Sequence, residues 1–71
     1  MPITEAALTD LRLRYEVAYD TYRGCVRALE DLWRRGERPS SRLRELQAEA
    51  QQQLDEARKH YRDALMQVAF E

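Results

Sequence analysis

Apolar residues recur along the first half of the chain at alternating steps of three and four. The positions are Leu8, Leu11, Tyr15, Ala18, Tyr22, Cys25, Leu29 and Leu32. This spacing places all eight side chains on one face of a helix. It is also the a and d pattern of a heptad, in which one helix packs along another. The first half of the chain therefore predicts one long helix that needs a partner to cover its apolar face.

The first helix has clear signals at both ends. Thr4 precedes it and is a favourable N-cap, because its hydroxyl accepts a hydrogen bond from a free backbone N–H of the first turn. Gly36 follows Arg34 and Arg35, and a glycine just past a basic last turn commonly ends a helix. No proline lies between these points. The sequence therefore predicts a helix over about residues 5–35.

A short connection and a second helix follow. Residues 36–40 include a glycine and Pro39, the two strongest helix breakers, and predict a turn. Ser40 or Ser41 is placed to cap the next helix, which meets no further proline or glycine and extends over about 41–69. Its apolar positions are Leu43, Leu46, Ala50, Leu54, Ala57, Tyr61, Leu65 and Val68. Their spacing averages close to 3.6 residues with a stutter midway, which predicts a nearly straight helix.

A turn this short between two long helices makes them antiparallel neighbours. Folding the chain at the turn sets Tyr15 against Tyr61 and Cys25 against Ala50, and every layer along the pair is then apolar on both sides. The predicted fold class is all-α, an antiparallel two-helix hairpin. It forms a single domain over residues 1–71.

A hairpin of 71 residues leaves part of its apolar surface open. Chains this short bury about 60% of their extended surface and are marginally stable alone, and a single cysteine excludes an internal disulfide. The first helix also carries a second apolar row, which indicates contact with another molecule. We therefore predict that two hairpins form a homodimeric four-helix bundle. The predicted dimer interface consists of Tyr19, Tyr22, Gly24, Cys25, Val26 and Trp33.

The sequence offers no set of residues for catalysis. Cys25 lies in the apolar stripe, where it acts as a small apolar residue, and no histidine is placed to activate it. His60 has Glu56 four residues before it and Asp63 three after it, which fits either a solvated charged face or a surface zinc site. The solvated face is the simpler interpretation. We assign no catalytic, cofactor-binding or metal-binding residue and expect a protein that is not an enzyme.

Arginines concentrate around the predicted turn. They are Arg34, Arg35, Arg38, Arg42 and Arg44, with Glu37 as the only acid among them. One interpretation is compensation of the helix dipole together with ordinary solvated side chains. The other is a contact site for nucleic acid or another anion beside the start of the second helix. The net charge of −1 gives the chain as a whole no attraction to nucleic acid.

Met66 and Phe70 lie outside the apolar stripe near the C-terminus. They either pack against the rest of the dimer or form a docking patch for a partner protein. The first functional hypothesis is a non-enzymatic interaction protein, with an adaptor, chaperone-like or regulatory role, that binds itself and another protein. The alternative is nucleic-acid or anion binding through the arginine-rich turn. No segment approaches the ~20 apolar residues of a membrane span, and no signal peptide is visible, so we expect no membrane partner and a cytoplasmic location.

Overall fold

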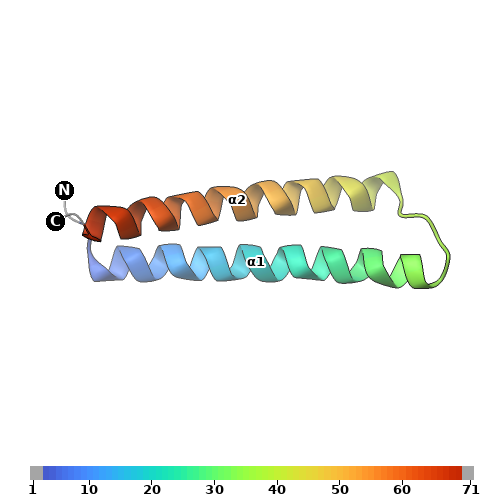
Figure 1. Ribbon diagram of the computed structural model, residues 1–71, viewed down its shortest axis with the longest axis horizontal. Helices are drawn as coiled ribbons and strands as arrows, with labels where there is room; N and C mark the ends of the chain where they lie inside the picture. Colours follow the sequence, from blue (N-terminus) through green and yellow to red (C-terminus); the bar gives the residue numbers. More distant parts are fainter. Residues whose placement is uncertain (1–2, 70–71) are drawn as a thin grey trace.

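The computed structural model describes residues 3–69 and contains two α-helices. Helix α1 spans Glu5–Arg34 and helix α2 spans Ser41–Ala69. They run antiparallel and side by side, with the turn at one end and the beginning of α1 and the end of α2 at the other (Figure 1). The molecule measures 52 × 15 × 15 Å. The predicted helical hairpin is confirmed, and both helices begin and end within one residue of their predicted bounds.

Hydroxyl side chains begin both helices. Oγ1 of Thr4 accepts a hydrogen bond from the backbone N–H of Ala7 at 3.1 Å. Oγ of Ser40 accepts one from the backbone N–H of Leu43 at 3.1 Å. Each bond satisfies an N–H group that the first turn of a helix leaves without an internal partner, and such a cap contributes about 1 kcal/mol. Thr4 is the predicted cap of α1, and Ser40 rather than Ser41 caps α2.

Gly36 ends α1 in a left-handed backbone conformation. Its φ is +73°, and its N–H donates to the carbonyl of Trp33 at 3.0 Å. The N–H of Glu37 donates to the carbonyl of Leu32 at 2.9 Å. This pair of bonds is the Schellman motif, which satisfies carbonyls that the last helical turn leaves free. Because a side chain makes the left-handed conformation about 1–2 kcal/mol less favourable, glycine fixes where α1 stops.

Replacing each of the two glycines by alanine should change the free energy of unfolding in opposite directions. Gly36→Ala places a β-carbon in the left-handed region, so we expect the free energy of unfolding to fall by about 1 kcal/mol. Gly24 lies inside α1, and a β-carbon there meets no atom within 4 Å. Gly24→Ala should therefore raise the free energy of unfolding by about 1 kcal/mol. Urea denaturation of the two variants measures both changes, and a loss at both positions would contradict this account of the glycines.

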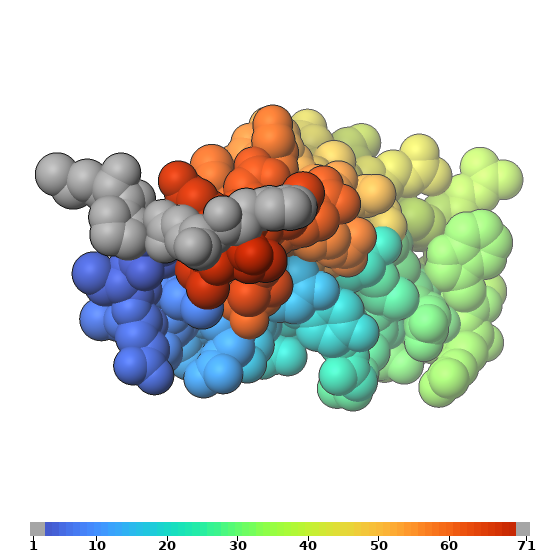
Figure 2. All heavy atoms as spheres, turned by 60° about the vertical axis from the view of Figure 1, so that its left-hand side comes forward, coloured from blue at the N-terminus to red at the C-terminus, as the bar shows by residue number. Residues whose placement is uncertain are grey.

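The apolar stripe of α1 faces α2 along its whole length. All eight stripe residues are half-buried, whereas every charged residue of α1 is exposed. The rings of Tyr15 and Tyr61 lie 6.1 Å apart, which confirms the predicted pairing at this layer. The buried residues of α2 are Ala50, Leu54 and Ala64, each 4% exposed. A space-filling view toward the open end of the hairpin shows the side chains of the two helices in contact (Figure 2).

Two positions of the predicted α2 stripe are wrong. Leu46 and Leu65 are 37% and 41% exposed, while Gln47 is half-buried and Ala64 is 4% exposed. At the open end of the hairpin, Val68 is also exposed, at 43%. The inward positions of α2 therefore alternate in steps of three and four, without the predicted stutter. The reason is geometric. A helix that packs along a strict heptad keeps the 3.5-residue period of that heptad, so the period decides which residues of α2 face inward, even where the adjacent residue is more apolar.

Candidate functional site

The exposed surface of the hairpin is large for its mass. The chain exposes 5865 Å² and has a radius of gyration of 16.0 Å. A compact protein of 8.5 kDa would expose about 4,650 Å² and have a radius of about 11 Å. Among residues 3–69, only Ala50, Leu54 and Ala64 are buried, and all three belong to α2. Helix α1 therefore leaves each of its apolar residues at least partly open.

Tyr19, Val26 and Trp33 follow one another at intervals of seven residues on α1, and we call the surface that they form the aromatic flank. Trp33 is 72% exposed and Tyr19 is 41% exposed. The ring of Tyr19 stacks on that of Tyr15 with 6.4 Å between centroids, and the Arg23 guanidinium lies 5.8 Å from the Tyr19 ring. An exposed row of this kind typically marks an interaction surface.

A hollow of about 260 Å³ opens on the aromatic flank. The residues that line it all belong to α1: Tyr19, Tyr22, Arg23, Val26, Arg27 and Glu30. The first four are spaced as i, i+3, i+4 and i+7, which is the set that forms a hole for one side chain of a neighbouring helix. The hollow is therefore suited to a side chain from another helix packed alongside α1.

The opposite flank carries a shallow groove between the two helices. Three neighbouring hollows of about 330, 390 and 240 Å³ form it, and Gln53 lines all three. Its small lining residues are Ala18, Thr21, Cys25, Ala50 and Ala57. Leu13 and Val17 lie at its rim and are 49% and 65% exposed. We call this surface the small-residue groove.

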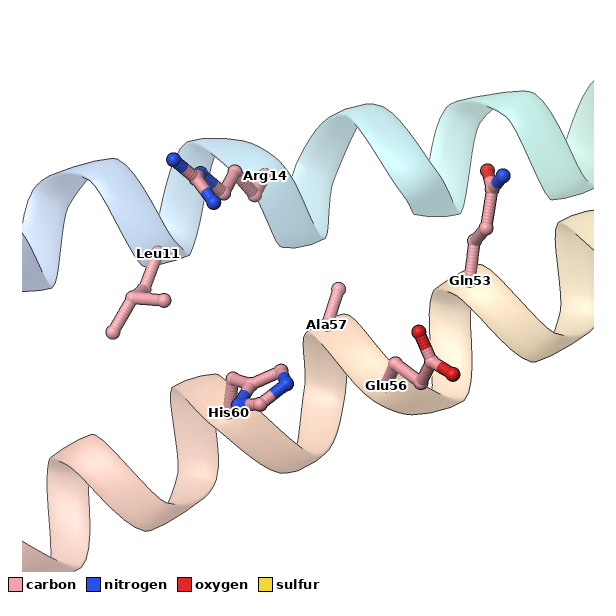
Figure 3. Close-up of a pocket in the computed structure, with 6 residues that line it drawn as sticks. All are labelled: Leu11, Arg14, Gln53, Glu56, Ala57 and His60. Atoms are coloured by element: carbon pink, nitrogen blue, oxygen red, sulfur yellow. The ribbon is translucent and has the colours of Figure 1, made fainter.

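Polar side chains gather at the end of the small-residue groove that lies farther from the turn (Figure 3). Arg14 comes from α1, and Glu56 and His60 come from α2. Arg14 pairs with Asp10 at 3.0 Å, and Glu56 accepts a hydrogen bond from Gln52 at 3.4 Å. In the described part of the chain, no hydrogen bond or ion pair joins Arg14, Glu56 and His60 to one another. Within residues 3–69, no group of three His, Cys, Asp or Glu side chains is arranged to hold a metal ion.

The six residues of the predicted dimer interface do not share one surface. Four of them belong to the aromatic flank: Tyr19, Tyr22, Val26 and Trp33. Cys25 lines the small-residue groove instead. Gly24, seven residues after Val17, lies on the groove side of α1. A single helix packed on one flank can therefore contact only one of these groups.

The arginines near the turn are exposed. Arg42 Nη1 lies 3.7 Å from Glu45 Oε2. The other four form no ion pair with any residue in the range 3–69: Arg34, Arg35, Arg38 and Arg44. The turn thus presents several exposed arginines that are not held in an ion pair with another residue of the described range.

Other exposed apolar residues lie away from the aromatic flank. Met66, predicted as part of a docking patch, is 52% exposed, and its companion Phe70 lies outside the described residues. Sequence reasoning missed Leu13, Val17 and Gln53 as surface features of the groove. Leu13 and Val17 are four residues apart outside the heptad stripe. This spacing places two apolar side chains side by side on an exposed face of the helix, and it was the signal that could have identified them. Gln53 gives no such signal, because glutamine is common on any exposed helix face.

No helix within residues 3–69 is long and apolar enough to cross a membrane. Comparison with models of protein families, with curated proteins and with solved structures gives no match. The class that the fold defines is a small antiparallel helical hairpin with two open flanks and an arginine-rich turn. Function is therefore inferred from these three surfaces.

Proposed function

We propose that this chain is a non-enzymatic interaction protein that acts as a homodimer, with two hairpins packed into a four-helix bundle. The observation that carries the proposal is the exposure of α1, which has an apolar stripe and an aromatic row but no buried residue. Small helical proteins with so little core gain stability when a second pair of helices covers them. The flank that the dimer leaves open is available to another protein, in an adaptor, chaperone-like or regulatory role.

The proposal includes a cytoplasmic location. The chain has one cysteine, Cys25, which is free and half-buried. Proteins of oxidising compartments typically pair their cysteines, whereas a lone thiol suits a reducing one. A homodimer stabilised by helix packing alone needs no oxidising environment.

Thermal unfolding should depend on protein concentration. A dimer that unfolds to two separate chains is stabilised by mass action, so its melting temperature rises as the protein is concentrated. For a transition of this size we expect a rise of about 5–10 °C over a hundredfold increase in concentration. Circular dichroism at a series of concentrations measures it. A melting temperature that stays constant would indicate that the hairpin folds alone and would overturn the proposed dimer.

A second candidate function is binding of nucleic acid or another anion through the turn. It is supported by the four turn arginines that lack a carboxylate partner within residues 3–69. They lie close to the first turn of α2, whose free N–H groups also favour an anion. Phosphate contacts of this kind are independent of base sequence and are weakened by salt.

Fluorescence anisotropy with labelled duplex DNA and single-stranded RNA tests the second candidate. If the turn binds phosphates, affinity should fall steeply as salt is raised, and Arg35→Gln combined with Arg38→Gln should weaken binding at least tenfold. Arg14→Gln, far from the turn along the hairpin, is the matched control. Absence of binding at low salt would exclude this function.

A further inference from the structure

The second copy in the proposed homodimer could cover either flank, and the distribution of charge distinguishes them. We propose that it covers the aromatic flank, with both turns at the same end, so that α1 of each hairpin packs against α2 of the other. This inference rests on the proposed function and specifies which surface and which geometry it uses.

The exposed area is sufficient for such a contact. The chain exposes 5865 Å², about 1,200 Å² more than a compact protein of its mass. A standard protein interface buries about 800 Å² on each partner. A second hairpin laid along one flank therefore has enough surface to cover, and the long shape of the molecule, 52 × 15 × 15 Å, lets the contact run its full length.

A two-fold axis parallel to the hairpin determines which residues meet. Such an axis exchanges the two copies without shifting them along their length. Each residue of α1 therefore meets residues of the partner's α2 at the same position along the long axis of the hairpin, which we call its height. Tyr15 and Tyr61 define one shared height, because their rings lie 6.1 Å apart. Counting equal steps along both helices from this pair gives the residue of α2 at the height of any residue of α1.

Most charges along the outer edge of the aromatic flank lie near a charge of opposite sign on α2; the exception is Arg12, seven residues before Tyr19, which comes within two residues of Arg62. On α1 this edge also carries, from the open end toward the turn, Glu16, Arg23 and Glu30. On α2 it carries, in the same direction, Arg62, Arg58, Asp55 and Arg44. Glu16, Arg23 and Glu30 each lie within two residues, or about 3 Å along the axis, of an opposite charge on α2. Because the two-fold axis repeats the contact, the dimer contains this complementary set twice.

These charges are largely available for a partner. All seven side chains are exposed. Within residues 3–69, Glu16 alone among them forms an ion pair, a long one of 4.0 Å to Arg12. Arg23 lies over the ring of Tyr19 and leaves its guanidinium edge open to a carboxylate. Opposed charges across an interface mainly fix its register and exclude wrong arrangements.

The hollow of the aromatic flank also has an occupant at the right height. Gln51 on α2 lies at the height of Cys25, between Arg23 and Val26 of the hollow. In the proposed dimer, Gln51 of the partner subunit therefore enters the hole that the neighbouring α1 presents. By the same count, Arg44 of the partner subunit lies beside Trp33, where a guanidinium can stack on the indole.

Two other arrangements, an antiparallel contact centred on Arg23 and a contact through the small-residue groove, bring like charges or an unpaired acid together. With the turns at opposite ends, α1 faces the partner's α1, and centring that contact on Arg23 opposes Arg23 to itself and Glu16 to Glu30. On the opposite flank, Glu49 and Glu56 line the small-residue groove, and Arg14 of α1, which lines the same hollow as Glu56, is already paired with Asp10 at 3.0 Å. A dimer through the groove would place Glu49, which forms no ion pair within residues 3–69, in the contact, and burying an unpaired carboxylate is unfavourable.

A charge exchange tests the pairing. Arg23→Glu should raise the dimer dissociation constant at least tenfold, since it places an acid against Asp55 of the partner subunit twice. Asp55→Arg should have a similar effect, and the two substitutions together should restore the dissociation constant to within about threefold of the original. Sedimentation velocity over a concentration series measures all four proteins, with circular dichroism confirming that each stays helical. A double variant as weak as the single ones would contradict the pairing.

The distance between the two turns tests the arrangement independently. A spin label on Arg38→Cys, in a Cys25→Ala background, reports the separation of the turns by pulsed dipolar spectroscopy. Neighbouring helices pack 8–10 Å apart, so turns at the same end give a distance within about 30 Å. Turns at opposite ends give about 50 Å, the length of the molecule, and would overturn the inference while leaving a dimer in place. If the labelled protein shows no dipolar coupling between two spins, it is a monomer, and the proposed homodimer is overturned.

Discussion

Truncation of Leu54 to alanine is expected to remove a large part of the folding stability of this protein. Leu54 is 4% exposed and is the only large side chain among the buried residues of the range 3–69. Removing a buried leucine side chain costs about 2–5 kcal/mol, because apolar contacts are lost and a cavity remains. The total stability of a small domain is only about 5–15 kcal/mol. Urea denaturation followed by helical circular dichroism measures the loss.

Leu46→Ala is the matched control for this prediction. The substitution is the same and lies on the same helix, but Leu46 is 37% exposed and outside the inward positions of α2. We expect it to cost less than about 1 kcal/mol. Equal losses at Leu54 and Leu46 would mean that both face α1, which would contradict the strict heptad of α2 and favour the register expected from apolar residues alone.

Trp33→Ala should weaken the proposed dimer by about thirtyfold or more. Trp33 is 72% exposed in the hairpin, so its removal takes little from the fold of one chain. In the proposed dimer it becomes covered at the turn end of the contact, beside Arg44 of the partner subunit, and a tryptophan that a partner covers fully typically contributes about 2 kcal/mol or more. Sedimentation velocity over a range of concentrations gives the dissociation constants of the variant and the original protein.

Val17→Ala provides the comparison for Trp33. Val17 is 65% exposed on the same helix, at the rim of the small-residue groove. If the second copy covers the aromatic flank, this change should alter the dissociation constant less than about threefold. A larger effect at Val17 than at Trp33 would place the second copy on the groove. The pair therefore distinguishes the two flanks by mutations of exposed residues that leave the core intact.

The ends of the helices could be predicted from the sequence because they depend on local chemistry. Thr4 caps α1 through a bond to a residue three positions away, and Gly36 adopts a conformation that its lack of a side chain permits. Both effects involve only near neighbours in the chain. The antiparallel pairing of Tyr15 with Tyr61 then follows from the shortness of the turn.

The inward face of α2 could be predicted only in part, because it depends on the partner helix. Leu54 was identified correctly, but apolar character favoured Leu46 over Gln47, whereas the structure places Gln47 inward. A strict heptad on α1 imposes its period on α2, so position along that period outweighs hydrophobicity. Extending alternating steps of three and four from Leu54 in both directions would have given Gln47 and Ala64.

The interaction surfaces were harder to predict than the fold. The sequence indicated that α1 has more apolar surface than α2 can cover, and the exposure of Tyr19 and Trp33 agrees with this. It did not show that Cys25 and Val26, adjacent in the chain, belong to opposite flanks. Assigning a residue to a flank requires the direction of the hairpin seam, which is a property of the packed pair of helices.

The mass of the protein in solution is the most direct test of the proposed dimer. Sedimentation equilibrium at tens of micromolar should give about twice the chain mass of 8.5 kDa. That result would agree with two hairpins covering each other's exposed surface. A mass of 8.5 kDa, from a sample that still unfolds cooperatively, would show that α1 and α2 are stable as an isolated pair and would contradict the four-helix bundle.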